Sequence, residues 1–152
     1  MESCFFIGHR DTGQAIAAPL QREVERHITE YGVGMFVVGH YGQFDHMAAQ
    51  AVIDAKKRHP QVTLTLLLPY HPFDQPIPPP DGFDGTLYPP DMERVPKRLA
   101  ILRANRYMVE HSAYLIAYVC RPSSGSREVL DAARRRQTLG LMCVTNLAGE
   151  TI

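Results

Sequence analysis

The segment Cys4-Phe5-Phe6-Ile7-Gly8 decides the fold class of this chain. Its four apolar residues follow one another without a polar interruption and end at a glycine, which is typical of a strand buried on both faces. The same pattern recurs in Met35-Phe36-Val37-Val38-Gly39, and apolar runs at 62–68, 114–120 and 141–144 are interpreted in the same way. Such continuous apolar strands are characteristic of parallel sheets covered by helices.

Helical patterns separate these strands. The clearest is the segment 44–55, in which apolar residues recur at spacings of three and one and form a single stripe. Segments 16–28, 95–110 and 127–137 have similar patterns. Alternating strands and helices predict an α/β fold, a Rossmann-like doubly wound parallel sheet of about five strands with helices on both faces.

The length of 152 residues predicts a single domain spanning residues 1–152. One stretch interrupts the alternation, because eight of the 12 prolines fall between residues 69 and 90. Such a segment cannot form a helix or an interior strand, and we interpret residues 69–92 as an ordered Pro-rich flap. Its aromatic side chains could close over a bound base; they are Tyr70, His71, Phe73 and Tyr88.

The charges cancel over the whole chain but not along it. Lys and Arg total 16, as do Asp and Glu, which argues against a long polyanion as partner, so nucleic acid is expected to be an unlikely one. Between Glu93 and Arg136, however, ten basic residues face four acidic ones, a local charge of +6. This basic segment leaves room for a small phosphate-bearing ligand in one local pocket.

Glycine and small polar residues gather where three of the predicted strands end, at 8–12, 39–45 and 123–126. Ligands of open parallel sheets bind at this edge, and glycines and helix N-termini suit an anion there. Each signal alone is weak: the glycines could simply end strands, and Arg10 could form a structural salt bridge instead of contacting an anion. The candidate ligand-binding residues at the strand ends are Gly8, His9, Arg10, Gly39, Gly42, Asp45, Ser124, Gly125 and Ser126.

The sequence contains no recognised motif for a cofactor, a metal ion, a membrane span or secretion. There is no GxGxxG or Walker sequence, and His40, Asp45 and His46 lack a recognised metal-ligand spacing, so neither a cofactor nor a metal is expected. The longest uninterrupted apolar run, 113–120, has eight residues, against about 20 for a transmembrane helix. With no secretory signal either, the sequence predicts a cytoplasmic protein without a membrane partner.

Three motifs together resemble the YpsA-like proteins of the SLOG superfamily, which includes the Lonely Guy phosphoribohydrolases and the Smf/DprA proteins. They are Gly8-His9-Arg10, Gly42-Gln43-Phe44-Asp45 and Asn105-Arg106-Tyr107-Met108-Val109-Glu110-His111-Ser112. The resemblance implies a Rossmann-like domain that binds a nucleotide or nucleotide-derived ligand and pairs as a homo-oligomer. In that site Arg103 and Arg106 would join Arg10 in offsetting phosphate charge, and Asn105 would hydrogen-bond a sugar or base edge.

Three functions follow, and the first is favoured: a cytoplasmic nucleotide-binding or sensing domain. The alternative is a hydrolase of the N-glycosidic bond of nucleoside 5'-monophosphates, but the catalytic glutamate of the Lonely Guy motif falls on Val129. Glu128 is adjacent, yet one residue along a helix is a rotation of about 100°, so no catalytic residue is assigned and the enzyme question stays open. The least favoured function is DprA-like nucleic-acid binding through Arg121, Arg127 and 134–136.

Overall fold

Strand β1 (Glu2–Gly8) lies at the centre of a sheet of six parallel strands, and the computed structural model describes residues 2–75 and 77–149. The order across the sheet is β4-β3-β2-β1-β5-β6. The remaining strands are β2 (Val33–Val38), β3 (Thr63–Leu67), β4 (Gly85–Leu87), β5 (Tyr114–Tyr118) and β6 (Cys143–Asn146).

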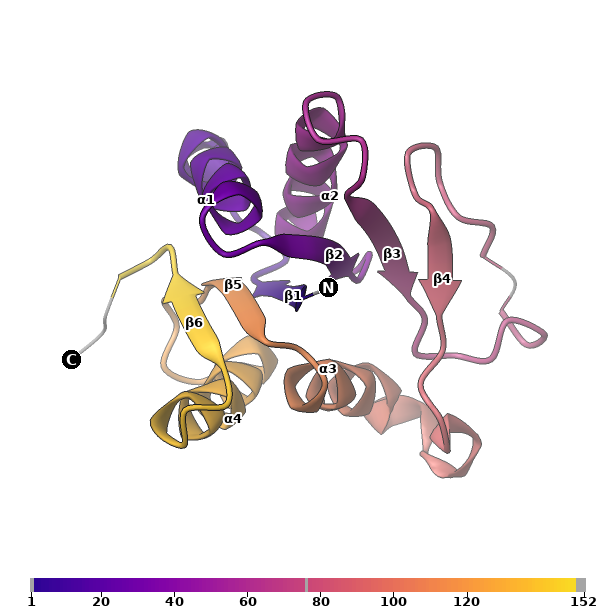
Figure 1. Cartoon of the computed structure of the whole chain (residues 1–152). Coiled ribbons are helices and arrows are strands. Elements are labelled where there is room, and N and C mark those ends of the chain that lie inside the picture. Colours follow the sequence, from indigo (N-terminus) through magenta and orange to yellow (C-terminus); the bar gives the residue numbers. More distant parts are fainter. Residues whose placement is uncertain (1, 76, 150–152) are drawn as a thin grey trace.

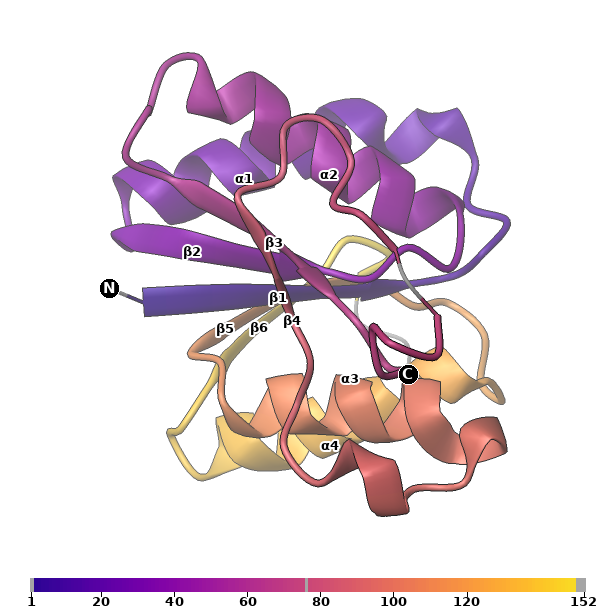
Figure 2. The same cartoon turned by 90° about the vertical axis from the view of Figure 1, so that its right-hand side faces the viewer.

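Two helices cover each face of the sheet (Figures 1 and 2). On one face lie α1 (Ala17–Thr29) and α2 (Gln43–Lys56), and on the other lie α3 (Ala100–Glu110) and α4 (Gly125–Thr138). Short 3-10 turns precede α1 and α3; they are η1 (Gln14–Ile16), η2 (Met92–Arg94) and η3 (Lys97–Leu99). The predicted doubly wound α/β fold is therefore confirmed.

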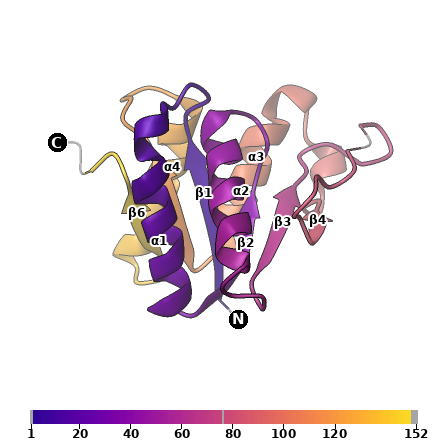
Figure 3. The same ribbon diagram turned by 90° about the horizontal axis from the view of Figure 1, so that it is seen from above.

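The winding reverses between β1 and β5, which are neighbours in the sheet although most of the chain separates them (Figure 3). Chain segments that leave β1 and β5 turn to opposite faces of the sheet, so a crevice opens beyond their carboxyl ends. The fold thus places its natural ligand position next to Gly8.

The sequence predicted five of these strands, and the sixth, β4, lies inside the Pro-rich flap. β4 pairs only with β3 and forms one edge of the sheet, the position where neighbouring prolines do not interrupt a ladder. Asp84 anchors the strand: its carboxylate accepts a bond of 2.6 Å from Lys56 Nζ and one of 2.8 Å from the Leu64 amide. The flap therefore returns to the sheet before it reaches α3.

Apolar side chains form one core on each side of the sheet. The α2 stripe predicted from spacing is buried throughout and packs on the first of these cores; its members are Phe44, Met47, Ala48, Ala51, Val52 and Ala55. Phe44 is fully buried beside Phe6, with ring centroids 6.5 Å apart. No helix in the described part of the chain is long and apolar enough to cross a membrane.

Candidate functional site

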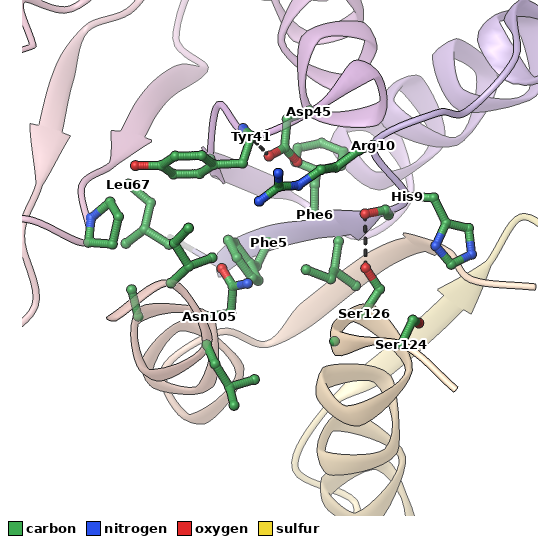
Figure 4. Close-up of a pocket in the computed structure, with 18 of the residues that line it drawn as sticks. Phe5, Phe6, His9, Arg10, Tyr41, Asp45, Leu67, Asn105, Ser124 and Ser126 are labelled. Carbon is green, nitrogen blue, oxygen red and sulfur yellow. Dashed lines mark hydrogen bonds between the residues drawn. The ribbon is translucent and has the colours of Figure 1, made fainter. Parts of the chain in front are cut away.

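A cavity of about 490 Å³ opens at the carboxyl ends of the central strands, between the first turns of α3 and α4 (Figure 4). We call it the strand-end pocket. Nine of the twelve predicted ligand-binding residues line it: Gly8, His9, Arg10, Gly39, Asp45, Asn105, Ser124, Gly125 and Ser126. The three strand-end loops singled out in the sequence therefore meet in one place.

Close packing explains two of the glycines. A Cβ at Gly8 would overlap the ring of Phe44, and a Cβ at Gly42 would lie 2.6 Å from the Arg10 Cα. Gly42 does not line the pocket, but it brings the loop after β2 against the loop after β1, where the Gln43 amide donates to the Arg10 carbonyl at 2.9 Å. These glycines shape the pocket wall by permitting close approach.

Arg10 supplies a positive charge inside the pocket. Within the described residues its guanidinium makes no hydrogen bond or ion pair, so the structural salt bridge considered as the alternative is not found there. Figure 4 shows the side chain beside Asp45 and directed toward Tyr41. An unpaired guanidinium in a concave site has all its donors available for a phosphate or carboxylate ligand.

Asp45 is the only carboxylate among the described residues that line the pocket. Burial raises its pKa to about 6, although the Tyr41 amide, which donates to Oδ2 at 3.1 Å, and the charge of Arg10 both act to lower that pKa. A carboxylate that holds its proton near pH 6 weakens its repulsion of a bound anion as the solution becomes acidic.

The N-terminus of α4 forms the opposite wall. Ser124 is the N-cap residue, and its hydroxyl accepts a bond of 3.1 Å from the Arg127 amide. The hydroxyl of Ser126 donates to the Gly8 carbonyl at 3.0 Å, joining α4 to the end of β1. Because the first amides of a helix lack intrahelical acceptors, this wall favours negative charge.

His9 has a structural position within the site. It is 4% exposed, and its Nε2 accepts a bond of 3.1 Å from the Cys120 amide, which ties the end of β1 to the chain after β5. Burial, with the positive charge of Arg121, lowers the pKa of His9 below its usual value. The neutral imidazole of His9 uses its Nε2 acceptor to hold the two strand ends together. That nitrogen is therefore not available to a ligand, contrary to what the sequence position suggested.

The three predicted ligand-binding residues of helix α3 do not line the same cavity. Asn105 lines the strand-end pocket, whereas Arg103 and Arg106 line a separate cavity of about 820 Å³ on another face of the helix. Successive helical residues are about 100° apart, so Arg103 and Arg106 lie about 60° from each other, while Asn105 lies about 160° from Arg103. The expectation that these arginines face the same ligand as Arg10 is not met.

Three polar side chains of the lining are absent from the predicted ligand-binding set, although the nucleic-acid alternative includes Arg121. Arg98 and Arg121 add guanidinium groups to the lining, and Tyr41 adds an aromatic ring whose pKa burial raises to about 12. Arg121 is engaged already, because its Nη2 lies 2.7 and 2.8 Å from the two carboxylate oxygens of Asp11. The basic pair Lys97-Arg98 was the available signal for Arg98.

The flap aromatics predicted to cover a base do not line the pocket. All four are among the described residues, and Phe73 is 88% exposed. The position of the Lonely Guy glutamate is equally unsuited to chemistry here, since Val129 is 1% exposed in the core and Glu128 lies outside the pocket lining. No group of three potential metal-ligating side chains occurs among the residues described.

Comparisons with known proteins place the fold. No family model and no curated protein match the chain. Among solved structures, it is similar to DNA processing protein A (DprA) from Streptococcus pneumoniae, with a TM-score of 0.62 at 14% identity. It is also similar to DprA from Helicobacter pylori, with a TM-score of 0.59 at 19% identity. The matches cover 96% and 94% of this chain but only 59% and 64% of those proteins.

These neighbours correct one expectation. Zero net charge predicts that nucleic acid is an unlikely partner, but both neighbours are DNA processing proteins, and the Helicobacter pylori structure is described by its single-stranded DNA binding mode. Net charge is a poor guide here because a local cluster of arginines can bind a polyanion whatever the total. The YpsA-like resemblance, the homo-oligomer and the cytoplasmic location stay predictions.

Proposed function

We propose that this domain binds single-stranded DNA and holds one nucleotide unit of it in the strand-end pocket. The observation that carries the proposal is an unpaired Arg10 guanidinium that lines the same cavity as the N-terminus of α4. The similarity of the fold to the DprA structures supports DNA as the source of that nucleotide.

Each pocket residue has a role in this proposal. Arg10 binds the phosphate through its fork of N–H donors, and the first amides of α4 provide a second set of donors. Asn105 hydrogen-bonds the sugar or a base edge, and the Tyr41 ring offers a face on which a base stacks. Phosphate contacts and stacking do not depend on base identity, so the binding has little sequence preference.

A free nucleotide is the second candidate ligand. The cavity of about 490 Å³ is in the size range of ordinary small-molecule sites, which supports a nucleotide-sensing domain. Cleavage of an N-glycosidic bond has weaker support, because such chemistry ordinarily uses a pair of carboxylates and Asp45 is the only one among the described lining residues.

Fluorescence anisotropy with labelled dT20 over a range of salt concentrations tests the proposal, with thymidine monophosphate as competitor. We expect wild-type binding that weakens steeply with salt, and a loss of about 10- to 100-fold for Arg10→Gln, since hydrogen bonds to charged groups contribute about 1.5–3 kcal/mol. Arg22→Gln, an exposed arginine on α1, is the matched control. Tight binding of the monophosphate with none of dT20 would favour the nucleotide sensor instead.

A further inference from the structure

The larger of the two cavities is not part of the proposed nucleotide position. It lies between α3 and the segment 89–96, and we call it the α3 groove. Three arginines and one tyrosine line it together with apolar side chains; they are Arg94, Arg103, Arg106 and Tyr107. The sequence motif 105–112, which the strand-end pocket uses only through Asn105, thus contributes mainly to this second cavity.

The arginines of the α3 groove are unpaired. Within the described residues none of the three side chains makes a hydrogen bond or ion pair, in contrast to the carboxylate-bound guanidinium groups of Arg26 and Arg121. Two carboxylates, those of Asp91 and Glu110, also line the groove without bonding to the arginines. Three arginines against these two carboxylates leave the lining with a formal charge of +1, and the unpaired guanidinium groups have donors available for an anionic ligand.

The α3 groove is adjacent to the strand-end pocket along α3. Leu102 lines both cavities, and Arg98 stands at the pocket side of the same helical segment. Arg98 and Arg106 are eight positions apart, a length of about 12 Å along a helix. Each strand of a DNA duplex has one phosphate per about 3.4 Å of helix axis, and although the phosphates of an extended single strand are farther apart, the path is long enough for more than one.

We infer that the α3 groove holds the nucleotides adjacent to the one in the strand-end pocket, so that one strand of DNA crosses the first turns of α3 from Arg98 to Arg106. The inference rests on the proposed function and extends its site. Tyr107, whose ring stacks on His111 with centroids 4.0 Å apart, gives the groove an aromatic surface. Aromatic side chains between basic ones are the usual equipment of single-strand binding surfaces, and they distinguish this partner from an acidic peptide.

The test compares a double variant, Arg103→Gln with Arg106→Gln, against a control that removes the same charge elsewhere, Arg22→Gln with Lys57→Gln. All four positions avoid the fully buried core, so both variants are expected to fold, and circular dichroism checks this. The probes are dT20 and the dinucleotide dT2. We expect the double variant to bind dT20 at least about tenfold more weakly, with the slope of log K against log salt reduced by about 1.4, because two phosphate contacts are lost.

Binding of dT2, which occupies the strand-end pocket alone, is expected to be the same in the double variant and the control. If the double variant and the control had equal dT20 affinities and salt slopes, the groove inference would be overturned. The proposed function would stand in that case, provided that Arg10→Gln still weakens binding of dT20. Absence of dT20 binding by the wild-type chain would overturn both. A decamer of glutamate that binds through these arginines when dT20 does not would identify an acidic peptide as the partner and also overturn the inference.

Discussion

The strand-end pocket and the α3 groove are adjacent, share Leu102, and are built in different ways. The pocket draws its residues from separate loops that buried packing holds together, as where Gly8 meets the ring of Phe44. The groove presents its arginines from one regular helix and the short segment before it. We therefore expect changes beneath the pocket to affect folding and binding together, and changes in the groove to affect binding alone.

This difference also separates the roles of the charges. Arg10 and Arg103 are both exposed, but Gly42 and Gln43 hold the backbone of the loop that carries Arg10 against the pocket wall. Arg103 lies on a helix and lines the α3 groove together with Arg94 and Arg106. We therefore expect the guanidinium of Arg10 to position one phosphate, and the clustered arginines of the groove mainly to raise affinity for a strand.

The largest expected effect is on folding and comes from Phe44→Ala. The fully buried ring supports the end of β1 at Gly8, and its removal leaves a cavity, so the free energy of unfolding should fall by about 3–5 kcal/mol. Urea denaturation followed by circular dichroism measures this change. Phe73→Ala is the control, because a phenylalanine that is 88% exposed should change stability by less than about 0.5 kcal/mol.

If Phe44→Ala lowered the free energy of unfolding by less than about 1 kcal/mol, the pocket would not depend on the core beneath it. The contrast between the pocket and the groove would then be wrong. Retained stability with lost dT20 binding would point to a direct effect on the loops. The expected result is a large loss of both stability and dT20 binding. Arg103→Gln, by contrast, should leave the free energy of unfolding within about 0.5 kcal/mol of wild type.

The sequence was a good guide to the regions in which local pattern and burial agree. The apolar stripe of α2 and the apolar runs of β1 and β5 are buried as predicted, because the period of a helix or strand is a local property. The run at 141–144 is an exception: Leu141 is 54% exposed, and β6 lies at the edge of the sheet. β4 was missed since three residues, Gly85 to Leu87, carry too little periodicity to be recognised between prolines. Its place in the sheet depends on Lys56 and Asp84, which are far apart in the sequence.

The site residues that follow strand ends could be predicted from the sequence. Residues whose contacts depend on a partner far along the chain could not. Glycines and serines after strands had to meet at one edge of a parallel sheet, and they do. Asp11 belongs to the polar stretch at 8–12, and nothing in that local pattern indicates that it binds Arg121, which lies 110 residues away. The separation of Arg103 from Asn105 needed only the helical period, so that error was one of interpretation rather than of missing information.

A smaller effect is expected at the α4 wall of the pocket. Ser124→Ala removes the hydroxyl that accepts from the Arg127 amide, and loss of an N-cap costs about 1 kcal/mol. For a domain of this size, the melting temperature should fall by about 2–4 °C. Ser123→Ala, at the exposed neighbouring position, should have no such effect, and equal melting temperatures in the two variants would show that the cap contributes nothing.

The smallest expected effect is a pH dependence confined to the pocket. Burial raises the pKa of Asp45 to about 6. Between pH 7.5 and 5 this carboxyl gains a proton and its charge beside Arg10 disappears, so dT2 should bind a few-fold more tightly at the lower pH. A dinucleotide without a terminal phosphate is the proper probe, because a terminal phosphate itself titrates near pH 6.

Asp45→Asn should bind dT2 at pH 7.5 as the wild type does at pH 5, with a flatter profile between them. The free energy of unfolding should change with pH in the same direction as dT2 binding. The pKa of Asp45 is higher in the folded chain than the ordinary 3.8, so the folded state binds more protons between about pH 4 and 6. The contribution of Asp45 to the free energy of unfolding therefore rises as the pH falls through that range, and Asp45→Asn removes it. If instead Asp45→Asn and wild type had the same binding profile, Asp45 would not be the group that opposes the anion. The Arg103 and Arg106 double variant should keep the wild-type profile with dT2, because those side chains lie outside the pocket.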